Sequence, residues 1–211
     1  MPRVKPKQIV LKQYPYSEGP PGRIKIANAL RDLLAEKHFN SITTSEISNK
    51  SGVNESLIYR YFGDKRGLLH AVLKEHLDEF VKRIAQDIKD APGALNKIRK
   101  IIKSTIEFYD RDRVFSKMLL IEVRNYPGYF DSETYMTIKQ YTNMLLSSIK
   151  EGIAAKEIRG DISPTFLRQI ILGAIEHMVL PALIHNSRID VEAYQKEISR
   201  VIFEGIHGAD S

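Results

Sequence analysis

The spacing of apolar residues limits the folds open to this chain more than any other feature. The clearest run steps by four, four, three, four and four residues and consists of Leu69, Leu73, Leu77, Phe80, Ile84 and Ile88. Steps of three and four place side chains on one face of an α-helix, whereas a half-buried strand alternates apolar and polar residues. No alternating stretch is long enough for a strand, so the sequence predicts an all-α fold with about nine helices and no internal repeat.

Capping residues and helix breakers give approximate bounds for these helices. Residues 43–46 have the pattern of a capping box, Gly52 supplies a stop, and Asn54 and Asp64 are N-cap candidates for the next two helices. Pro181 is expected to kink a late helix or to end it early. The predicted helices cover residues 24–39, 43–51, 55–62, 65–91, 98–108, 114–121, 132–158, 163–186 and 190–205.

Composition and missing motifs exclude several classes of protein. The 211 residues include no cysteine, so the chain has no disulfide, thiolate metal site or cysteine nucleophile. The histidines show no metal-binding spacing and no Walker, GxGxxG or GxSxG motif occurs, so we expect no catalytic residue, cofactor or metal. No apolar run reaches the ~18 residues of a membrane span and no signal peptide is evident, so we expect a cytoplasmic protein without a membrane partner.

Positive charge is concentrated in the first third of the chain. Residues 1–66 hold 12 Lys and Arg against 6 Asp and Glu, whereas residues 67–211 hold 20 of each. A basic third joined to a neutral remainder favours a polyanion-binding module with a separate second function, although a merely charged tail is the alternative. We therefore divide the chain into a flexible basic arm (1–22), a basic module (23–66) and a neutral remainder (67–211).

The middle of this basic segment has the pattern of a helix-turn-helix. Two short helices that cross steeply need a small residue at their contact, a glycine in the turn and apolar residues facing inward. Ser48 fills the first position and Gly52 the second, and the inward positions are Ile47, Val53, Ile58 and Phe62. Another α-helical bundle matches one or two of these positions by chance, but all of them together favour DNA binding.

The segment SITTSEISNKSGVNESLIYRYFGDKRGLL, residues 41–69, resembles the DNA-binding domain of TetR (tetracycline-repressor) family regulators. The likeness covers residues 23–69, and beyond residue 70 it is limited to length and helix layout. The resemblance implies a homodimeric transcription regulator, usually a repressor, which a small ligand in the C-terminal domain releases from a palindromic operator in double-stranded DNA. It makes residues 23–66 the helix-turn-helix DNA-binding domain and residues 67–211 the ligand-binding and dimerisation domain. The competing hypothesis is an architectural DNA-binding protein without an effector, which has little need for 145 neutral residues.

The resemblance implies a set of phosphate contacts. Thr43 and Thr44 stand at the positive end of the first helix of the motif, where a hydroxyl and backbone amides can hold a phosphate. Tyr59, Tyr61 and Lys65 match positions that usually contact phosphates and so set the register on DNA. For Tyr59, packing in the core is the alternative.

Base reading is expected in the first turn of the second helix of the motif. The residues are Glu55, Ser56 and Leu57, with Arg60 either on a guanine or on the backbone. Glu55 departs from the basic residue or glutamine of many relatives, and it needs a cytosine amino group to offset repulsion by phosphates. Leu57 replaces a common threonine and offers only apolar contact, most naturally to a thymine methyl. Operator affinity then depends more on the arm, which either enters the minor groove or gives non-specific attraction.

The C-terminal domain is expected to hold the effector and the dimer interface. An aromatic and methionine-rich set suits an elongated apolar ligand, although plain core packing is the alternative, and a fatty acid or acyl-CoA is the effector to test first. The candidate pocket residues are Phe108, Tyr109, Met118, Ile121, Tyr141, Met144, Leu145, His177 and Met178. In the family the last two long helices form a four-helix bundle with the partner, which assigns the dimer interface to Ile170, Ala174, Leu180, Ile184, Val201 and Ile202.

Overall fold

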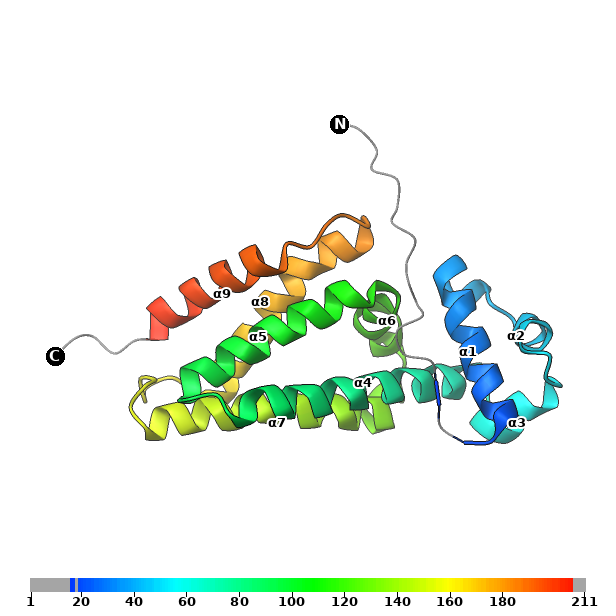
Figure 1. The fold of residues 1–211 in the computed structure, drawn as a ribbon, viewed down its shortest axis with the longest axis horizontal. Helices are drawn as coiled ribbons and strands as arrows, with labels where there is room; N and C mark the ends of the chain where they lie inside the picture. Colours follow the sequence, from blue (N-terminus) through cyan, green and yellow to red (C-terminus); the bar gives the residue numbers. More distant parts are fainter. Residues whose placement is uncertain (1–15, 18, 207–211) are drawn as a thin grey trace, which may run out of the picture.

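The computed structural model of the chain describes residues 16–17 and 19–206. This part contains nine α-helices and no strand, which confirms the all-α class (Figure 1). The helices are α1 Pro21–Glu36, α2 Thr44–Ser51, α3 Ser56–Phe62, α4 Lys65–Lys89, α5 Ala94–Arg111, α6 Arg113–Lys117, α7 Glu133–Ala154, α8 Pro164–Ile184 and α9 Val191–Ile206.

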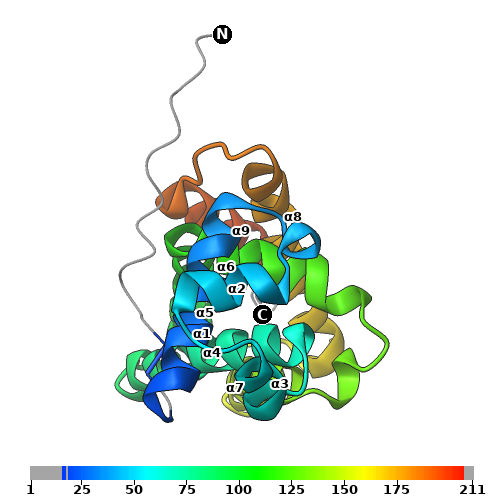
Figure 2. The same ribbon diagram turned by 90° about the vertical axis from the view of Figure 1, so that its right-hand side faces the viewer.

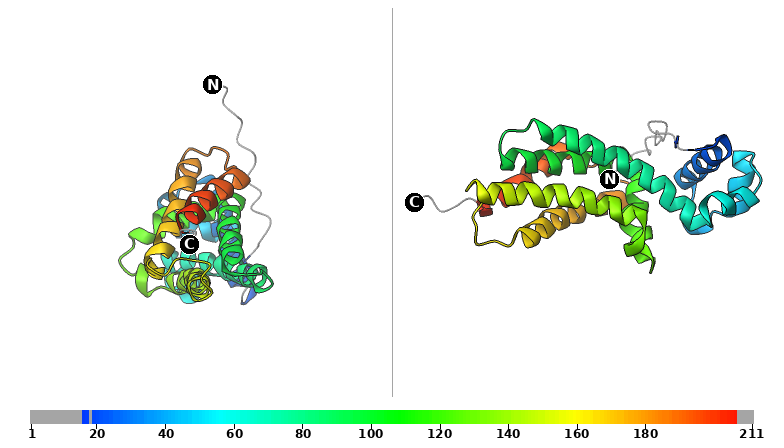
Figure 3. Two further views of the ribbon diagram at one scale, coloured as in Figure 1. Left: turned by 90° about the vertical axis from the view of Figure 1, so that its left-hand side faces the viewer. Right: turned by 90° about the horizontal axis from the view of Figure 1, so that it is seen from below.

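The helices form two groups that share α4. The helices α1, α2 and α3 gather at one end, and α4 runs from them along the larger group made by α5 to α9 (Figures 1 and 3). Seen from that end, α2 and α3 lie at the front of the molecule (Figure 2). α4 packs against α1 and α3 and also against α5 and α7. The domain boundary expected after residue 66 therefore falls within the first turn of a helix that belongs to both groups.

The capping residue Asp64 starts α4 as its position predicts. The Asp64 carboxylate accepts a hydrogen bond from the Gly67 amide at 2.7 Å. The apolar side chains that step along α4 are buried as the periodicity predicts, from Leu69, which is 1% exposed, to Ile84, which is 0% exposed. Burial along so much of its length makes α4 a rigid connection between the two groups.

The structure corrects the expected flexible arm at residues 16, 17, 21 and 22. The backbone amide of Tyr16 donates to Oδ1 of Asn28 at 2.9 Å, and Nδ2 of Asn28 donates back to the Tyr16 carbonyl at 3.1 Å. The amide and hydroxyl of Ser17 both donate to Oε1 of Glu75 on α4, at 2.8 and 2.7 Å. Residues 21 and 22 form the first turn of α1. The rest of the arm, residues 1–15 and 18, lies outside the described part.

Several predicted helix ends differ from the observed ones; for example, the helices expected over 24–39 and 98–108 are α1 at Pro21–Glu36 and α5 at Ala94–Arg111. α7 ends at Ala154, before the expected residue 158, and Lys156 then takes a left-handed φ of 60°. α8 continues to Ile184, three residues past Pro181, whose ring lies on the exposed side of the helix. The helix expected over 114–121 is α-helical only to Lys117 and continues as a π turn at Met118–Glu122 and a 3-10 turn at Val123–Asn125.

Candidate functional sites

α2 and α3 form the helix-turn-helix that the sequence predicts. Gly52 ends α2 in the left-handed region with φ 65° and ψ 24°, which a side chain would strain. Ile47 and Ile58 are 0% exposed between the helices. The Ser48 hydroxyl donates to the Val53 carbonyl at 2.8 Å, so the small residue at the contact also fixes the turn.

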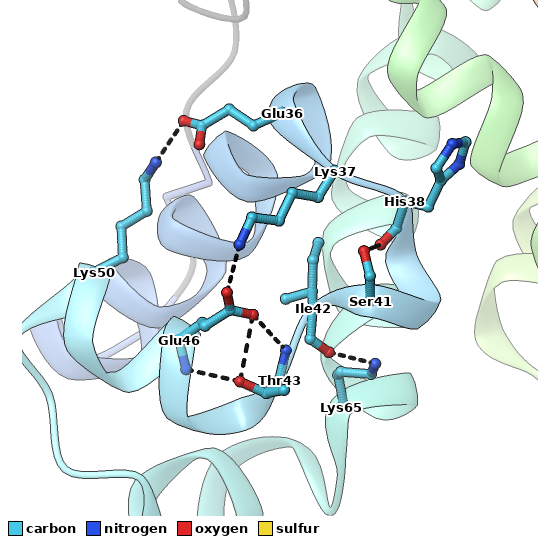
Figure 4. A network of polar contacts seen from close by, with 9 residues as sticks. All are labelled: Glu36, Lys37, His38, Ser41, Ile42, Thr43, Glu46, Lys50 and Lys65. Carbon is cyan, nitrogen blue, oxygen red and sulfur yellow. Dashed lines mark hydrogen bonds and ion pairs between the residues drawn. The ribbon is translucent and has the colours of Figure 1, made fainter.

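The start of α2 is held by polar contacts with α1 (Figure 4). The Thr43 hydroxyl accepts from the Glu46 amide at 3.1 Å, and Glu46 Oε2 accepts from the Thr43 amide at 2.9 Å, which confirms the capping box. Lys37 bonds the same carboxylate and holds the pKa of Glu46 below its ordinary value. Because these contacts use the Thr43 hydroxyl and amide, the backbone amides of Thr44 and Ser45 are the groups left to face a phosphate.

Lys65 is a structural residue in this fold. Its ammonium donates to the Ile42 carbonyl at 2.6 Å (Figure 4). It also donates to the Phe39 carbonyl at 3.0 Å and lies 4.5 Å from the centre of the Phe39 ring. Burial lowers the pKa of Lys65. Through these bonds the first turn of α4 fixes the segment 39–42 that leads into α2. The family resemblance implied that Lys65 contacts a DNA phosphate. Its bonds to the carbonyls could not be predicted from the sequence, because these partners lie 23 and 26 residues away.

The first turn of α3 has its polar side chains fixed. Asn54 Oδ1 accepts from the Ser56 amide at 2.9 Å and from the Ser56 hydroxyl at 2.7 Å, so Asn54 caps the helix as predicted. Glu55 Oε1 accepts a hydrogen bond from the hydroxyl of Thr44. Leu57 is half-buried and packs against the core, which leaves less of it for a thymine methyl than the sequence suggested.

The next turn of α3 separates its aromatic residues. Tyr59 is 52% exposed, so the alternative of core packing does not hold for it. Arg60 is also exposed. Tyr61 is half-buried beside α1, where its ring would lie 3.6 Å from a Cβ at Gly22, and it meets the Phe62 ring edge-on. Tyr59 and Arg60 are therefore the more accessible of the predicted DNA contacts on this turn.

The larger group contains a cleft between α4 and α5. Its cavity volume is about 30 Å³, and the hollow in front of it is open to solvent. It is lined by His76, Glu79, Phe80, Arg83, Ser104, Glu107, Phe108 and Arg111. The rings of Phe80 and Phe108 are buried and their centres are 4.3 Å apart. Arg111 is exposed. The cleft thus joins an aromatic wall to two guanidinium groups and two carboxylates, those of Glu79 and Glu107.

Most of the predicted pocket residues lie elsewhere. Phe108 alone of that set lines the cleft. Tyr109, Met118, Tyr141 and Leu145 are buried in the core, where the Tyr141 hydroxyl lies 2.8 Å from the Thr105 hydroxyl and burial raises the pKa of Tyr109. The half-buried or exposed remainder is Met144, Met178, Ile121 and His177. Helical periodicity predicts which side chains face inward, but it does not predict between which helices a cleft opens.

One largely buried polar pair lies beside the cleft, with the side chains of His76 and Asp112 10% and 15% exposed. Nε2 of His76 is 3.8 Å from Oδ2 of Asp112, and the imidazole stacks on Phe115 with ring centres 4.5 Å apart. Asp112 Oδ1 also accepts from the Phe115 amide at 3.2 Å and caps α6. Burial lowers the pKa of His76 to about 4 and raises the pKa of Asp112 to about 6. No sequence motif marks this pair, since the histidines show no metal-binding spacing.

An apolar face runs along α8. Phe166, Ile170 and Ile184 are 60%, 42% and 52% exposed, and Val201 on α9 is 67% exposed. α8 is long and apolar enough to cross a membrane by length and composition, and 33% of its apolar window is buried. Of the other predicted interface residues, Ala174 and Leu180 are half-buried, whereas Ile202 is buried within the chain. Sequence reasoning missed Phe166, which lies one turn before Ile170.

Models of known protein families match both groups of helices. Residues 26–72 match bacterial regulatory proteins of the tetR family, and residues 73–205 match the C-terminal region of YsiA-like protein. The fatty acid metabolism regulator protein of Bacillus subtilis (strain 168) is 26% identical over 187 residues, which cover 89% of this chain and 96% of that protein.

Solved structures share the whole fold. The crystal structure of the transcriptional regulator FadR from Bacillus subtilis in complex with stearoyl-CoA has a TM-score of 0.78 at 25% identity and covers 87% of this chain and 99% of that chain. The fatty acid degradation regulator FadR from Bacillus halodurans has a TM-score of 0.77 at 20% identity and covers 89% of this chain and 97% of its own. The second likeness concerns the fold alone.

Proposed function

Because this chain belongs to the TetR family of bacterial regulatory proteins, we propose that it is a homodimeric repressor that a fatty acid or fatty acyl-CoA releases from a near-palindromic operator. The chain is a ligand-responsive DNA-binding transcription regulator. The observation that supports the proposed mechanism best is the continuity of α4, which begins directly after the helix-turn-helix and supplies one wall of the α4–α5 cleft.

At the operator, α3 enters the major groove and α2 meets the backbone. The amides of Thr44 and Ser45 at the positive end of α2 face a phosphate. Tyr59 and Arg60, which are exposed on α3, contact the backbone or base edges. One seven-residue helix covers only a few base pairs, so a repressor of this kind needs two copies about 34–36 Å apart, or a multiple of that distance.

The exposed side of α8 supplies the dimer interface. Large apolar side chains such as Phe166 and Ile184 are more than half exposed on this helix. A second copy related by a two-fold axis would cover this face with the same face. Gly173, whose Cβ position has no atom within 4 Å, would let the partner helix approach closely.

The effector occupies the α4–α5 cleft. Phe80 and Phe108 contact its acyl chain, while Arg83 and Arg111 attract its carboxylate or phosphates. The likeness to a regulator crystallised with stearoyl-CoA supports this class of effector. A ligand that separates α4 from α5 changes the direction of α4 and therefore the spacing of the two α3 helices in the dimer.

A genomic selection tests this function. The purified chain is mixed with fragmented DNA from its own source, and the bound fragments are sequenced. We expect enrichment of sites with two inverted half-sites, and release of those sites by stearoyl-CoA or a free long-chain fatty acid. Binding without any sequence preference, unaffected by either ligand, would favour the architectural hypothesis instead.

A further inference from the structure

A hydrogen bond between α2 and the start of α3 fixes the side chain of Glu55. The donor is the hydroxyl of Thr44, the first residue of α2, and the acceptor is Oε1 of Glu55, which directly precedes α3. Both side chains are half-buried. One carboxylate oxygen is thereby engaged within the chain, and the orientation of the other is set before any DNA arrives.

The hydroxyl of Ser56, the next residue, is not available as a hydrogen-bond donor to DNA. The Ser56 hydroxyl donates to Asn54 Oδ1 at 2.7 Å, so toward a further group it offers lone pairs. Leu57 adds no polar group. The side chains of residues 55–57 therefore present hydrogen-bond acceptors to whatever lies in front of the first turn of α3.

The major groove offers few partners for a fixed carboxylate. Guanine presents two acceptors, N7 and O6, and thymine presents the acceptor O4, so both repel it. Adenine presents the donor N6, but its acceptor N7 lies next to N6 and repels the carboxylate. Cytosine presents the N4 amino donor without an adjacent acceptor of its own. A carboxylate that cannot rotate away thus favours cytosine over the other three bases.

We propose that Glu55, held by Thr44, accepts a hydrogen bond from the N4 amino group of a cytosine in each operator half-site. This assignment rests on the proposed function, because it places α3 in the major groove. Glu55 makes the specific contact, and Thr44 is a positioning residue that acts through it. The threonine sets the discrimination among bases rather than the overall affinity.

Selection from a library of randomised duplexes tests the assignment. The wild-type chain should enrich one invariant cytosine per half-site, and its replacement by another base in both half-sites should weaken binding by about tenfold to a hundredfold. Glu55→Gln should move the preference at that position to adenine, because a carboxamide matches the N6 and N7 edge. Thr44→Val should bring cytosine and adenine within about threefold of each other, whereas Thr44→Ser, which keeps the donor, should retain the wild-type preference.

The outcomes separate this assignment from the function on which it rests. A wild-type chain that enriches no sequence at all would overturn the proposed function and this assignment with it. Enriched inverted sites without the cytosine, or an unchanged preference in Glu55→Gln, would overturn the assignment and leave the function standing. Thermal unfolding of each variant shows that the fold is intact, and Glu55→Gln tests the contact independently of any change in α2.

Discussion

His76 and Asp112 form a largely buried pair in which burial favours the neutral form of both groups. Nε2 of His76 lies 3.8 Å from Oδ2 of Asp112, beside the α4–α5 cleft and at the start of α6. Burial lowers the pKa of His76 to about 4, with smaller contributions from the charges of Arg83 and Arg31. Burial raises the pKa of Asp112 to about 6, against the hydrogen bonds and the positive charge that lower it.

These two groups make opposite contributions to the pH dependence of stability. The contribution of Asp112 is fully present below its unfolded pKa of about 3.8 and is lost as the pH rises through about 6. The contribution of His76 is fully present above its unfolded pKa of about 6.5 and is lost as the pH falls toward about 4. In the wild-type chain the two slopes largely cancel between pH 4 and 6.5.

Asp112→Asn should uncover the contribution of the histidine. Asparagine keeps a side-chain acceptor for the Phe115 amide but does not ionise. Between pH 6.5 and pH 4, the free energy of unfolding of the variant should therefore fall by about 2–3 kcal/mol more than that of the wild-type chain. Urea unfolding at four pH values measures the free energy of unfolding of each protein. His76→Gln is the matched variant and should show the reverse, a free energy of unfolding that falls from pH 4 to pH 6. If the free energy of unfolding had the same pH dependence in all three proteins, His76 and Asp112 would not make opposite contributions.

Lys65→Met should weaken operator binding without changing its salt dependence. Methionine keeps an unbranched stem against Phe39 but loses the two bonds to the carbonyls of Phe39 and Ile42, so the start of α2 loses its anchor. We expect a loss of about 1–3 kcal/mol in the free energy of unfolding. Binding isotherms at three salt concentrations give the slope.

Arg60→Ala is the control for that measurement. Arg60 is exposed on α3, and removal of a phosphate contact should reduce the salt slope by about one unit. If Lys65→Met reduced the slope as Arg60→Ala does, Lys65 would be a direct phosphate contact, as the family resemblance suggested.

Local chemistry made the helix-turn-helix predictable. The capping box at Thr43, the stop at Gly52 and the cap at Asp64 each act within a few residues, so the sequence pattern contains the whole interaction. The bonds of Lys65 and the pair of His76 with Asp112 join residues 23 to 36 positions apart. Such contacts depend on how helices pack, which periodicity does not define.

The same limit explains the predicted pocket. Tyr141 and Leu145 have the spacing of inward-facing residues, and both are buried on α7, which packs against α4 and α5. The cleft instead opens where charged residues such as Arg83 and Glu107 flank the aromatic rings on α4 and α5. A search for apolar residues alone passes over a site whose lining is half charged.

Ile170→Glu should separate the proposed dimer. The side chain is 42% exposed on the apolar face of α8, so a carboxylate costs little in one copy but would be buried without a partner between two. We expect the mass by light scattering to fall to that of one chain at micromolar concentration, with loss of operator affinity. Lys139→Glu, on an exposed position of α7, changes charge away from this face and should leave the mass unchanged. A dimer that survives Ile170→Glu would place the interface elsewhere.

Arg111→Gln should weaken the binding of an anionic effector. Arg111 is exposed at the cleft, so it contributes attraction that salt screens, and we expect about a 3- to 10-fold loss of stearoyl-CoA affinity at low salt. Calorimetric titration measures the affinity. Lys89→Gln removes one positive charge from the end of α4, outside the cleft lining, and should have little effect. Equal losses in both variants would indicate attraction by net charge rather than a contact in the cleft.

Operator DNA and effector should weaken each other's binding by the same factor. α4 begins at the helix-turn-helix and carries Phe80 into the cleft. In the proposed mechanism, one position of α4 favours DNA and a second position of the same helix favours the ligand. Linkage makes the coupling reciprocal, and a coupling of about 1–3 kcal/mol corresponds to a 5- to 150-fold change in either affinity. Titration of stearoyl-CoA with and without saturating operator gives this factor, and titration of operator with and without stearoyl-CoA gives it again. Two unequal factors would mean that a further equilibrium, such as dimer dissociation, accompanies release, and Ile170→Glu would then show whether that equilibrium is the dimer. If neither ligand changed the affinity of the other, stearoyl-CoA would be excluded as the effector. A ligand that binds both positions of α4 equally well does not change the equilibrium between them.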